Sequence, residues 1–569
     1  MKIIKRFLLV VVLVIGTALV PAPARAAGTT FYVDNANPGC SDSGPGTSTG
    51  QPWCTLARVT SGRPYGAGDS ILLARGRTWA ESLDLTGSGT AAAPITVAGY
   101  GSGDRPKITN GGRAGYGIRV TNSSYWAFRD LELDGAGANK LDAGLQAVYG
   151  TIGHQGLTLS NLYVHHTRLG IAITGQAAPA VGEWGVKGVV INNVEGTHNE
   201  TSIALGNATT TERLIQNVTI TAAHLHHDDG APAPEGGGCP NSLTLQSATE
   251  VLVTNSLIDG AGGCPMATGT TGVYLGHVAK VTLLNNLIVN TKATGSPDQT
   301  GIDYEAGTTD VAVRGNYLGG NAGWGVEVLT IHPSPGGDHR GVAIDANSFA
   351  NNVPGIARLG SEATATGTID RNLWTSSGLT FHDGATFDGM IIGGQAPNPG
   401  PVTSDRIWYA ARDFSTGQGT YGWRFEHSTN AGASWSPLTY IPASGDWRPA
   451  AGGLPQAGKW TWHPGGGSAY VAKAWTAPAA GTIAITGQAA KGAVGGDGIR
   501  VRVLRTSAAG TTTVLGPTAI GGADRIGRPT SIDALTVAQG DVIRFVVDAG
   551  AAGENSNDTT NWTPAIGYL

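Results

Sequence analysis

Three acidic side chains in two short segments have the spacing of an acid–base site. Residues 301–305 read Gly-Ile-Asp-Tyr-Glu, and residues 325–328 read Gly-Val-Glu-Val. Alternate side chains of a β-strand point to opposite faces, so Asp303 and Glu305 share one face. Glu327 holds the same position in its segment as Asp303. If the two segments are successive strands of a parallel sheet, Asp303 and Glu327 lie roughly 4.8 Å apart, with Glu305 about 7 Å further along.

Carboxylates this close repel one another when ionised, so at least one pKa should rise. A perturbed carboxyl group is typical of a site that transfers protons, which makes these three residues candidates for catalysis. Acidic residues on an outer strand face are also often no more than solvated. Both interpretations stay open at this point.

The elements that must hold these residues form a repeat between residues 156 and 375. Its unit is a Val-x-Val strand, a bend with Asn, a second short strand, a variable loop and a Gly-x-x-x strand with apolar second and fourth residues. The period of roughly 25 to 33 residues is that of a solenoid, and no helix fits between the strands, so we expect a parallel β-helix. Asparagine tolerates the left-handed conformation and can bond to its equivalent in the next coil. We therefore expect one ladder of Asn161, Asn193, Asn286, Asn316, Asn347 and Asn372.

The glycine-initiated strands also predict one outward row across the coils. Small residues lie at both ends of this row, and an aromatic residue and two acids lie in its middle; the row is Ala172, Ala204, Thr244, Tyr274, Asp303, Glu327 and Ala357. An apolar ring beside carboxylates is what a sugar needs at the bond to be broken.

Long loops on a solenoid usually line the binding face, and three are uneven here: residues 226–240, 259–271 and 291–300. They bring His226, His227, Asp228, Asp229 and Lys292 into consideration. We expect the two aspartates to assist catalysis. The residues expected to bind substrate are Tyr274, His226, His227, Lys292 and Trp324. A histidine in a turn is often structural, and this applies also to His165 and His166. Asp and His together could bind Ca²⁺ or a transition metal, but their spacing matches no known metal motif.

The N-terminus predicts export. Lys2, Lys5 and Arg6 precede an apolar stretch at residues 7–20, and Ala24-Arg25-Ala26 supplies a cleavage site, so residues 1–26 are expected to be a signal peptide. A retained anchor is the alternative, but the apolar run is shorter than a ~20-residue span. We expect a secreted, extracellular protein with no membrane segment after cleavage.

Four cysteines fit that compartment, because disulfides form in oxidising environments. The simplest of the three possible connectivities is Cys40–Cys54 and Cys239–Cys264. No Cys-x-x-Cys spacing suggests a zinc site.

Composition limits the remaining possibilities. A net charge of −5 over 569 residues gives no basic footprint for nucleic acid. The 88 glycines and the lack of helical periodicity predict an all-β chain. We expect the β-helix with its N-terminal cap at residues 27–390, a linker at 391–403 and an antiparallel β-sandwich at 404–569. Eight tryptophans after residue 404 would either bind carbohydrate or fill the sandwich core.

Several segments resemble one family. Residues 30–34, 66–76, 87–101 and 125–133 resemble the opening of secreted right-handed parallel β-helix proteins of the pectate-lyase-like fold. Residues 301–305 resemble an acidic segment found in many of them. The resemblance covers roughly residues 31–374 and implies a polysaccharide lyase or a glycoside hydrolase, with an accessory β-sandwich behind it. The polygalacturonase pattern of Asn-Thr-Asp followed by Asp-Asp is missing.

We expect a glycoside hydrolase that acts on a polysaccharide or oligosaccharide without a cofactor. Asp303 and Glu327 would be the acid and the nucleophile or base, assisted by Glu305 or by the Asp228–Asp229 pair. Their expected separation is nearer the roughly 5 Å of retaining than the 6.5–9.5 Å of inverting enzymes.

Two alternatives stay open. One is a Ca²⁺-dependent lyase, with Lys292, Arg314 or His277 as base. The other is a non-catalytic glycan-binding surface protein, because solenoids expose long flat faces. The sequence does not predict the sugar, the linkage or the oligomeric state.

Overall fold

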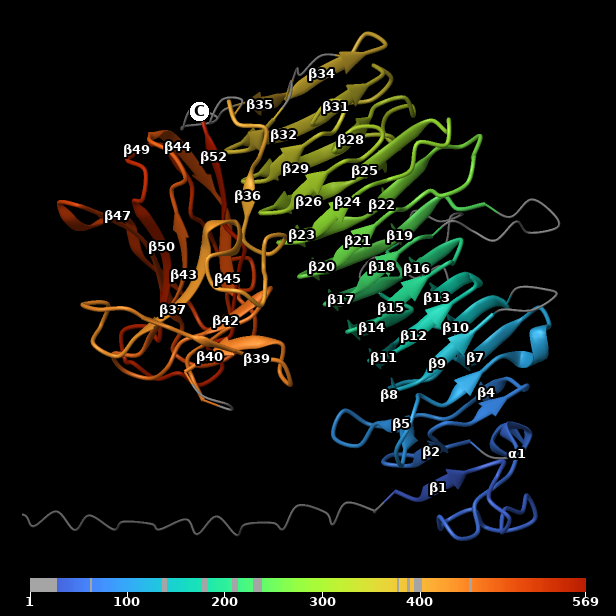
Figure 1. The fold of residues 1–569 in the computed structure, drawn as a ribbon. Helices are drawn as coiled ribbons and strands as arrows, with labels where there is room; N and C mark the ends of the chain where they lie inside the picture. Colours follow the sequence, from blue (N-terminus) through green and yellow to red (C-terminus); the bar gives the residue numbers. More distant parts are fainter. Residues whose placement is uncertain are drawn as a thin grey trace, which may run out of the picture.

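The chain folds as a parallel β-helix followed by antiparallel sheets, seen in the computed structural model of Figure 1. The structure describes residues 28–569 except 62–63, 136–140, 176–182, 207–212, 229–237, 376–377, 386–388, 393–401 and 450–452. Each coil contributes one strand to each of three parallel sheets, in the chain order sheet 1, sheet 2, sheet 3. The predicted fold class is confirmed.

The three sheets of the β-helix contain 13, 11 and 11 strands. Sheet 1 consists of β1 (Thr30–Val33), β2 (Ser70–Ala74), β5 (Ile95–Tyr100), β8 (Trp126–Arg129), β11 (His154–Ser160), β14 (Val186–Asn192), β17 (Ile215–Thr221), β20 (Ala248–Thr254), β23 (Ala279–Leu284), β26 (Thr309–Arg314), β29 (His339–Asp345), β32 (Ala365–Asp370) and β35 (Met390–Ile392). Sheet 2 consists of β3 (Thr78–Trp79), β6 (Lys107–Ile108), β9 (Glu132–Asp134), β12 (Tyr163–His165), β15 (Glu195–Thr197), β18 (His224–His226), β21 (Leu257–Asp259), β24 (Leu287–Val289), β27 (Tyr317–Gly319), β30 (Ser348–Ala350) and β33 (Leu373–Trp374). Sheet 3 consists of β4 (Leu83–Leu85), β7 (Tyr116–Thr121), β10 (Leu141–Tyr149), β13 (Thr167–Gly175), β16 (Thr201–Leu205), β19 (Asn241–Gln246), β22 (Thr270–Gly276), β25 (Asp298–Ala306), β28 (Val326–Leu329), β31 (Ile356–Leu359) and β34 (Leu379–His382).

The C-terminal region is built from antiparallel sheets of four, six and seven strands. Its strands are β36 (Trp408–Tyr409), β37 (Trp423–Ser428), β38 (Ser436–Pro437), β39 (Thr439–Ile441), β40 (Asp446–Arg448), β41 (Gln456–Ala457), β42 (Thr461–His463), β43 (Tyr470–Thr476), β44 (Gly481–Thr486), β45 (Gln488–Lys491), β46 (Ile499–Ser507), β47 (Gly510–Ile520), β48 (Arg528–Pro529), β49 (Ile532–Val537), β50 (Val542–Asp548), β51 (Thr560–Trp562) and β52 (Ala565–Tyr568). The described helical segments are short: α1 (Leu56–Thr60), η1 (Asn110–Gly112) and η2 (Thr420–Gly422). Five tryptophans of this region are buried in its core and cannot stack on a sugar: Trp423, Trp447, Trp462, Trp475 and Trp562.

Asparagines form a buried ladder inside the bend between sheets 1 and 2. The side-chain oxygens of Asn316, Asn347 and Asn372 each accept the backbone N–H and the side-chain N–H of the asparagine one coil earlier, which are Asn286, Asn316 and Asn347 in turn, at 2.9–3.1 Å. The expected single row of six is two adjacent rows, because Asn161 and Asn193 stand one position earlier. That earlier position is left-handed, with φ 52° at both residues, and it favours Asn for a different reason.

The C-terminal sheets pack against the later coils of sheet 2, where Figure 1 shows them in orange and red. Outward residues of this sheet, Leu287, Tyr317 and Leu373, share an apolar cluster with Ile407 and Tyr409. The Tyr409 hydroxyl also donates to the Gly315 carbonyl at 2.8 Å. The β-helix and the antiparallel sheets therefore share an apolar contact.

The disulfides Cys40–Cys54 and Cys239–Cys264 form as predicted. The second joins the segment before β19 to the segment before β22, two neighbouring strands of sheet 3. Among the described residues, no helix has the length and apolar character needed to cross a membrane. The expected signal peptide lies outside the described residues.

Candidate active site

Sheet 3 holds the predicted outward row in the predicted register. Tyr274 of β22 pairs with Asp303 of β25, which pairs with Glu327 of β28, which pairs with Ala357 of β31. Towards the N-terminus, the same register continues to β19, where Thr244 pairs with Tyr274. The alternation of strand side chains places the two acids on adjacent strands, directly opposite each other.

These two acids are buried, although outward residues of a solenoid strand are normally solvated. Asp303 is 3% exposed and Glu327 is 0% exposed. Among the described residues, neither carboxylate oxygen of Glu327 has a hydrogen-bond partner, and the same is true of Asp303 Oδ1. Buried polar atoms nearly always have a partner, so these oxygens are acceptors suited to a group that the folded chain does not supply.

Burial and neighbouring charge raise the pKa of both acids. Desolvation raises the pKa of Glu327 from 4.5 to about 9, with further contributions from Asp298 and Glu305. Desolvation also raises the pKa of Asp303 well above its ordinary value, followed by the repulsion of Glu327 and then of Glu305. The expected increase in the pKa of at least one of these acids is confirmed in direction. Glu327 therefore keeps its proton at neutral pH, and burial favours the neutral form of Asp303 as well.

A fourth acid, Asp298, belongs to the same electrostatic group and was not among the predicted catalytic residues. Burial and then Glu305 raise its pKa to about 6. Asp298 opens β25 in a left-handed conformation with φ 65°. It fits there because its neighbour across the coil is Gly269, where a Cβ atom would lie 1.8 Å from Asp298 Oδ2. The only sequence signal was its place in the loop at residues 291–300.

Glu305 lies at the rim of this group. Its side chain is 24% exposed, and its Oε1 lies 2.8 Å from Nε2 of His332, which is 41% exposed. Asp303 and Glu305 lie two residues apart on the same face of β25, and Glu305 helps to raise the pKa of Asp303. His332 was not predicted, because its contact crosses from the loop after β28 to the previous coil.

The two predicted aromatic residues have different surroundings. Tyr274 is half-buried beside Asp303, and burial, Glu305 and Asp303 raise the pKa of its hydroxyl. Trp324 is half-buried, and its ring centroid lies 5.8 Å from that of His382. The backbone of Trp324 is fixed by the Thr300 hydroxyl, which donates to its carbonyl at 2.7 Å. Both rings come from the part of the chain that carries the acids.

Other predicted residues lie on a different part of the coils. His226 is the last residue of β18 in sheet 2, and His227 follows it in a left-handed corner with φ 52°. Asp228 is fully buried at that corner. Its Oδ1 accepts from the Ser202 hydroxyl at 2.8 Å and from the backbone N–H of Asn199 at 3.2 Å. These contacts tie two coils together.

Lys292 and the remaining candidates are similarly separate from the acids. Lys292 is exposed, and its stem packs beside Gly260 just after β21. Arg314 is the last residue of β26 in sheet 1. His277 follows β22, and its pKa is lowered mainly by burial and to a smaller extent by nearby charges, including that of His332. Asp229 lies outside the described residues.

The acids of sheet 3 act on one another. The charges that shift the pKa of Asp303 and Glu327 all come from carboxyl groups. In the described part of the chain, the sets of three His, Cys, Asp or Glu ligand atoms within 4.8 Å of one another lie in sheet 2 and exclude these acids. The arrangement in sheet 3 can therefore give, take or share protons, and the described residues do not form a compact cation cage there.

Comparisons with known proteins give short or distant similarities. No family model matches the chain. A stretch of 99 residues, 16% of the chain, is 36% identical to lacto-N-biosidase of Bifidobacterium longum subsp. longum and spans 6% of that relative's length.

Two solved structures align over more of the chain. GH136 lacto-N-biosidase from Eubacterium ramulus aligns over 64% of this chain and 68% of its own, with 16% identity and a TM-score of 0.47. Alginate lyase from a Paenibacillus species aligns over 59% of this chain and 96% of its own, with 17% identity and a TM-score of 0.36.

Proposed function

We propose that this protein is a glycoside hydrolase whose active site is the acidic group on sheet 3. The observation that carries the proposal is the directly opposed pair Asp303 and Glu327, buried together with raised pKa values and without a cationic partner. Such a pair is unfavourable for folding, and its presence therefore indicates a role in acid–base catalysis. The short match to a lacto-N-biosidase supports the same class of reaction.

The geometry favours distinct roles for these carboxyl groups. Glu327, with a pKa near 9, keeps its proton at neutral pH and is suited to protonate the leaving oxygen. We assign the second role to the carboxylate of Asp303, which lies opposite Glu327 and beside the more exposed Glu305. That carboxylate would attack the anomeric carbon or activate water, with His332 fixing Glu305.

The substrate would approach through the more exposed residues around the buried pair. Glu305, His332, Tyr274 and Trp324 are partly accessible and come from strands or loops next to Asp303. A sugar ring that stacks on an aromatic side chain and hydrogen-bonds to Glu305 would lie over the acids. Side chains above Glu327 must move aside before it can touch the glycosidic oxygen, since it is fully buried.

The substrate class is a glycan, and the first compound to test is a chromogenic lacto-N-bioside, followed by plant and microbial polysaccharides. Protein from residue 27 onward would be assayed for reducing ends and for the absorbance of unsaturated products, with and without chelator. Glu327→Gln and Asp303→Asn should each reduce kcat/KM by about 10²–10⁴-fold. Asp310→Asn, an exposed acid on sheet 1, is the matched control and should retain activity.

Each result discriminates between the functional classes. Reducing ends without an unsaturated chromophore, lost in both variants and kept in the control, would support the hydrolase. An unsaturated product that disappears with chelator would overturn it in favour of a Ca²⁺-dependent lyase. Glycan binding that survives Asp303→Asn, with no product from any substrate, would instead indicate a non-catalytic binding protein. If turnover occurs, the anomer first formed tests the expected retention of configuration.

A further inference from the structure

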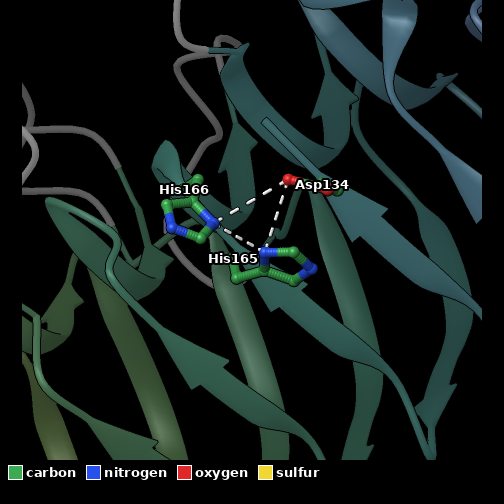
Figure 2. A group of neighbouring side chains, drawn as sticks. All are labelled: Asp134, His165 and His166. Atoms are coloured by element: carbon green, nitrogen blue, oxygen red, sulfur yellow. Dashed lines mark hydrogen bonds and ion pairs between the residues drawn. The ribbon is translucent and has the colours of Figure 1, made fainter. Parts of the chain in front are cut away.

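The early coils of sheet 2 carry a second group of polar side chains, far from the proposed active site. Figure 2 shows Asp134, from the end of β9, facing His165 of β12 and His166 just after it. The coil of β12 stands four coils before that of β24 and β25, which is about 19 Å along the axis at ~4.8 Å per coil. This group is on a different sheet from Asp303 and Glu327.

Three ligand-type atoms converge in this group. Nδ1 of His165 lies 2.7 Å from Nδ1 of His166 and 3.4 Å from Oδ1 of Asp134, and Nδ1 of His166 lies 3.8 Å from the same oxygen. Bonds of 2.0–2.1 Å to a tetrahedral zinc ion would place its ligand atoms about 3.3–3.4 Å apart. The three observed separations bracket that spacing, so one ion could contact all three atoms after small side-chain adjustments.

The orientation of the His165 ring is set by a further acid. Nε2 of His165 lies 3.2 Å from Oε1 of Glu132, the residue that begins β9, and the ring is 7% exposed. In the tautomer whose Nε2–H donates to that carboxylate, Nδ1 keeps a lone pair directed at His166 and Asp134. A carboxylate behind the far nitrogen is the usual companion of a metal-binding histidine.

We propose that Asp134, His165 and His166 bind a divalent transition-metal ion such as Zn²⁺, with Glu132 orienting His165. Two imidazoles and one carboxylate match zinc and similar ions better than Ca²⁺, which prefers oxygen. His166 is 41% exposed, so an ion can reach the site from solvent and keep a water ligand in the fourth position.

The surrounding charge is compatible with a dication. Glu132 and Asp134 supply two negative charges, and Lys107 supplies one positive charge at 2.7 Å from Glu132 and 3.3 Å from Asp134. Lys107 contacts Oδ2 of Asp134, whereas the histidines face Oδ1. The lysine therefore occupies the opposite side of the carboxylate and leaves the proposed ligand atom accessible to an ion.

The chain contains an internal comparison two coils later. His226 and His227 repeat the arrangement, with their Nδ1 atoms 2.8 Å apart and Nε2 of His226 at 3.3 Å from Glu195. At the position of Asp134, however, this second pair has Thr197, whose hydroxyl lies 3.3 Å from Nδ1 of His226. A hydroxyl is a poorer zinc ligand than a carboxylate, so the second pair should bind metal more weakly.

The test is a titration of the full chain from residue 27, purified without a histidine tag. Zn²⁺ binding would be followed by calorimetry and Co²⁺ binding by its visible spectrum. His224→Ala removes a ligand of the other three-ligand set in sheet 2, Glu195, His224 and His226, and in this background the chain should bind one tight equivalent and show a Co²⁺ spectrum of low coordination number. His166→Ala and Asp134→Asn should each weaken binding by at least 10-fold, and Glu132→Gln by about 10–100-fold.

Two further variants make the test specific. His198→Ala removes a ring that stacks on His166 at 5.2 Å but offers no ligand to the site. The Zn²⁺ affinity of this variant should equal that of wild type. Thr197→Asp should add a second tight equivalent at His226 and His227. Glycoside hydrolysis should be unchanged in His166→Ala, which separates this proposal from the proposed function. Failure of wild type to bind Zn²⁺, or binding that His166→Ala leaves unaltered, would overturn the metal site and leave a shared proton between the two rings.

Discussion

At the scale of single residues, the proposed site is a place where the chain accepts unfavourable electrostatics. Asp303 and Glu327 are buried with unpaired oxygens, and Asp298 and Glu305 add further negative charge. Residues that serve only the fold would rarely be kept in this state, because a buried polar atom without a partner costs about 1–3 kcal/mol. Conflict between stability and activity is typical of catalytic residues.

The first prediction follows from the raised pKa of Glu327. Between pH 4.5 and about 9 the folded state holds a proton that the unfolded state has released, so stability should fall as pH rises through this range. Glu327→Gln removes the ionisable group and should raise Tm at pH 8 by several degrees while abolishing activity. Thermal unfolding at pH 5 and pH 8 measures both effects. An unchanged or lower Tm at pH 8 in the variant would contradict the burial argument.

The second prediction concerns Asp298. Its negative charge raises the pKa of Glu327, after the larger effect of burial. Asp298→Asn should therefore lower the pKa of Glu327 and move the alkaline limb of the kcat/KM–pH profile to lower pH. The exposed variant Asp310→Asn, on another sheet, should leave the profile in place. A limb that does not move in Asp298→Asn would mean that Glu327 is not the proton donor.

At the scale of the elements, the sequence predicted which residues align across neighbouring coils better than it predicted the contacts between loops and strands. The row from Ala172 to Ala357 was predicted to the residue because each strand alternates strictly after a small residue, which is a glycine in most coils and a serine at Ser202 and Ser242. The asparagine ladder was predicted with an error of one position for Asn161 and Asn193, because two adjacent bend positions both favour Asn.

Contacts that depend on loops were not predictable from these patterns. The burial of Glu327 and the contact of His332 with Glu305 depend on loops of irregular length, which have no period to read. Asp228 illustrates the opposite error: its loop suggested catalysis, yet its hydrogen bonds to Ser202 and Asn199 connect coils. The spacing of the repeat in the sequence predicts which strand a residue occupies. The conformation of the irregular loops determines whether that residue is buried and what it contacts.

The third prediction tests the ladder. Asn347 accepts from the backbone and the side chain of Asn316 and donates to the Val313 carbonyl at 2.8 Å. Asn347→Ala leaves several buried groups without partners and should lower the free energy of unfolding by about 3 kcal/mol or more. Asn193→Ala, at the exposed left-handed corner, should cost less, about 1 kcal/mol for the strained backbone. Denaturant unfolding of both variants provides the measurement, and equal effects would show that the ladder contributes no special stability.

At the scale of the whole molecule, sheet 2 changes character along the solenoid. Its outward row is polar in the early coils, with Glu132, Tyr163, Glu195 and His224. In the later coils it is apolar except at the buried Ser348, with Leu257, Leu287, Tyr317 and Leu373. The apolar part is covered by the antiparallel sheets, and the polar part carries the proposed metal site. The strands of sheet 2 thus carry the proposed metal site in the early coils and the contact with the C-terminal sheets in the later coils.

The final prediction tests whether that apolar contact holds the two regions together. Leu287 is 4% exposed and packs in the cluster that joins the β-helix to the C-terminal sheets. Leu287→Asp would bury an unpaired charge there, so the contact should open, since such a charge is removed most easily by exposing it to water. The radius of gyration from X-ray scattering should increase, and proteolysis should separate the regions. Val190→Asp, on an exposed position of sheet 1, is the control that should keep the compact scattering profile. An unchanged radius of gyration in Leu287→Asp would mean that the polar contacts, such as that of Tyr409 with Gly315, suffice to hold the regions together.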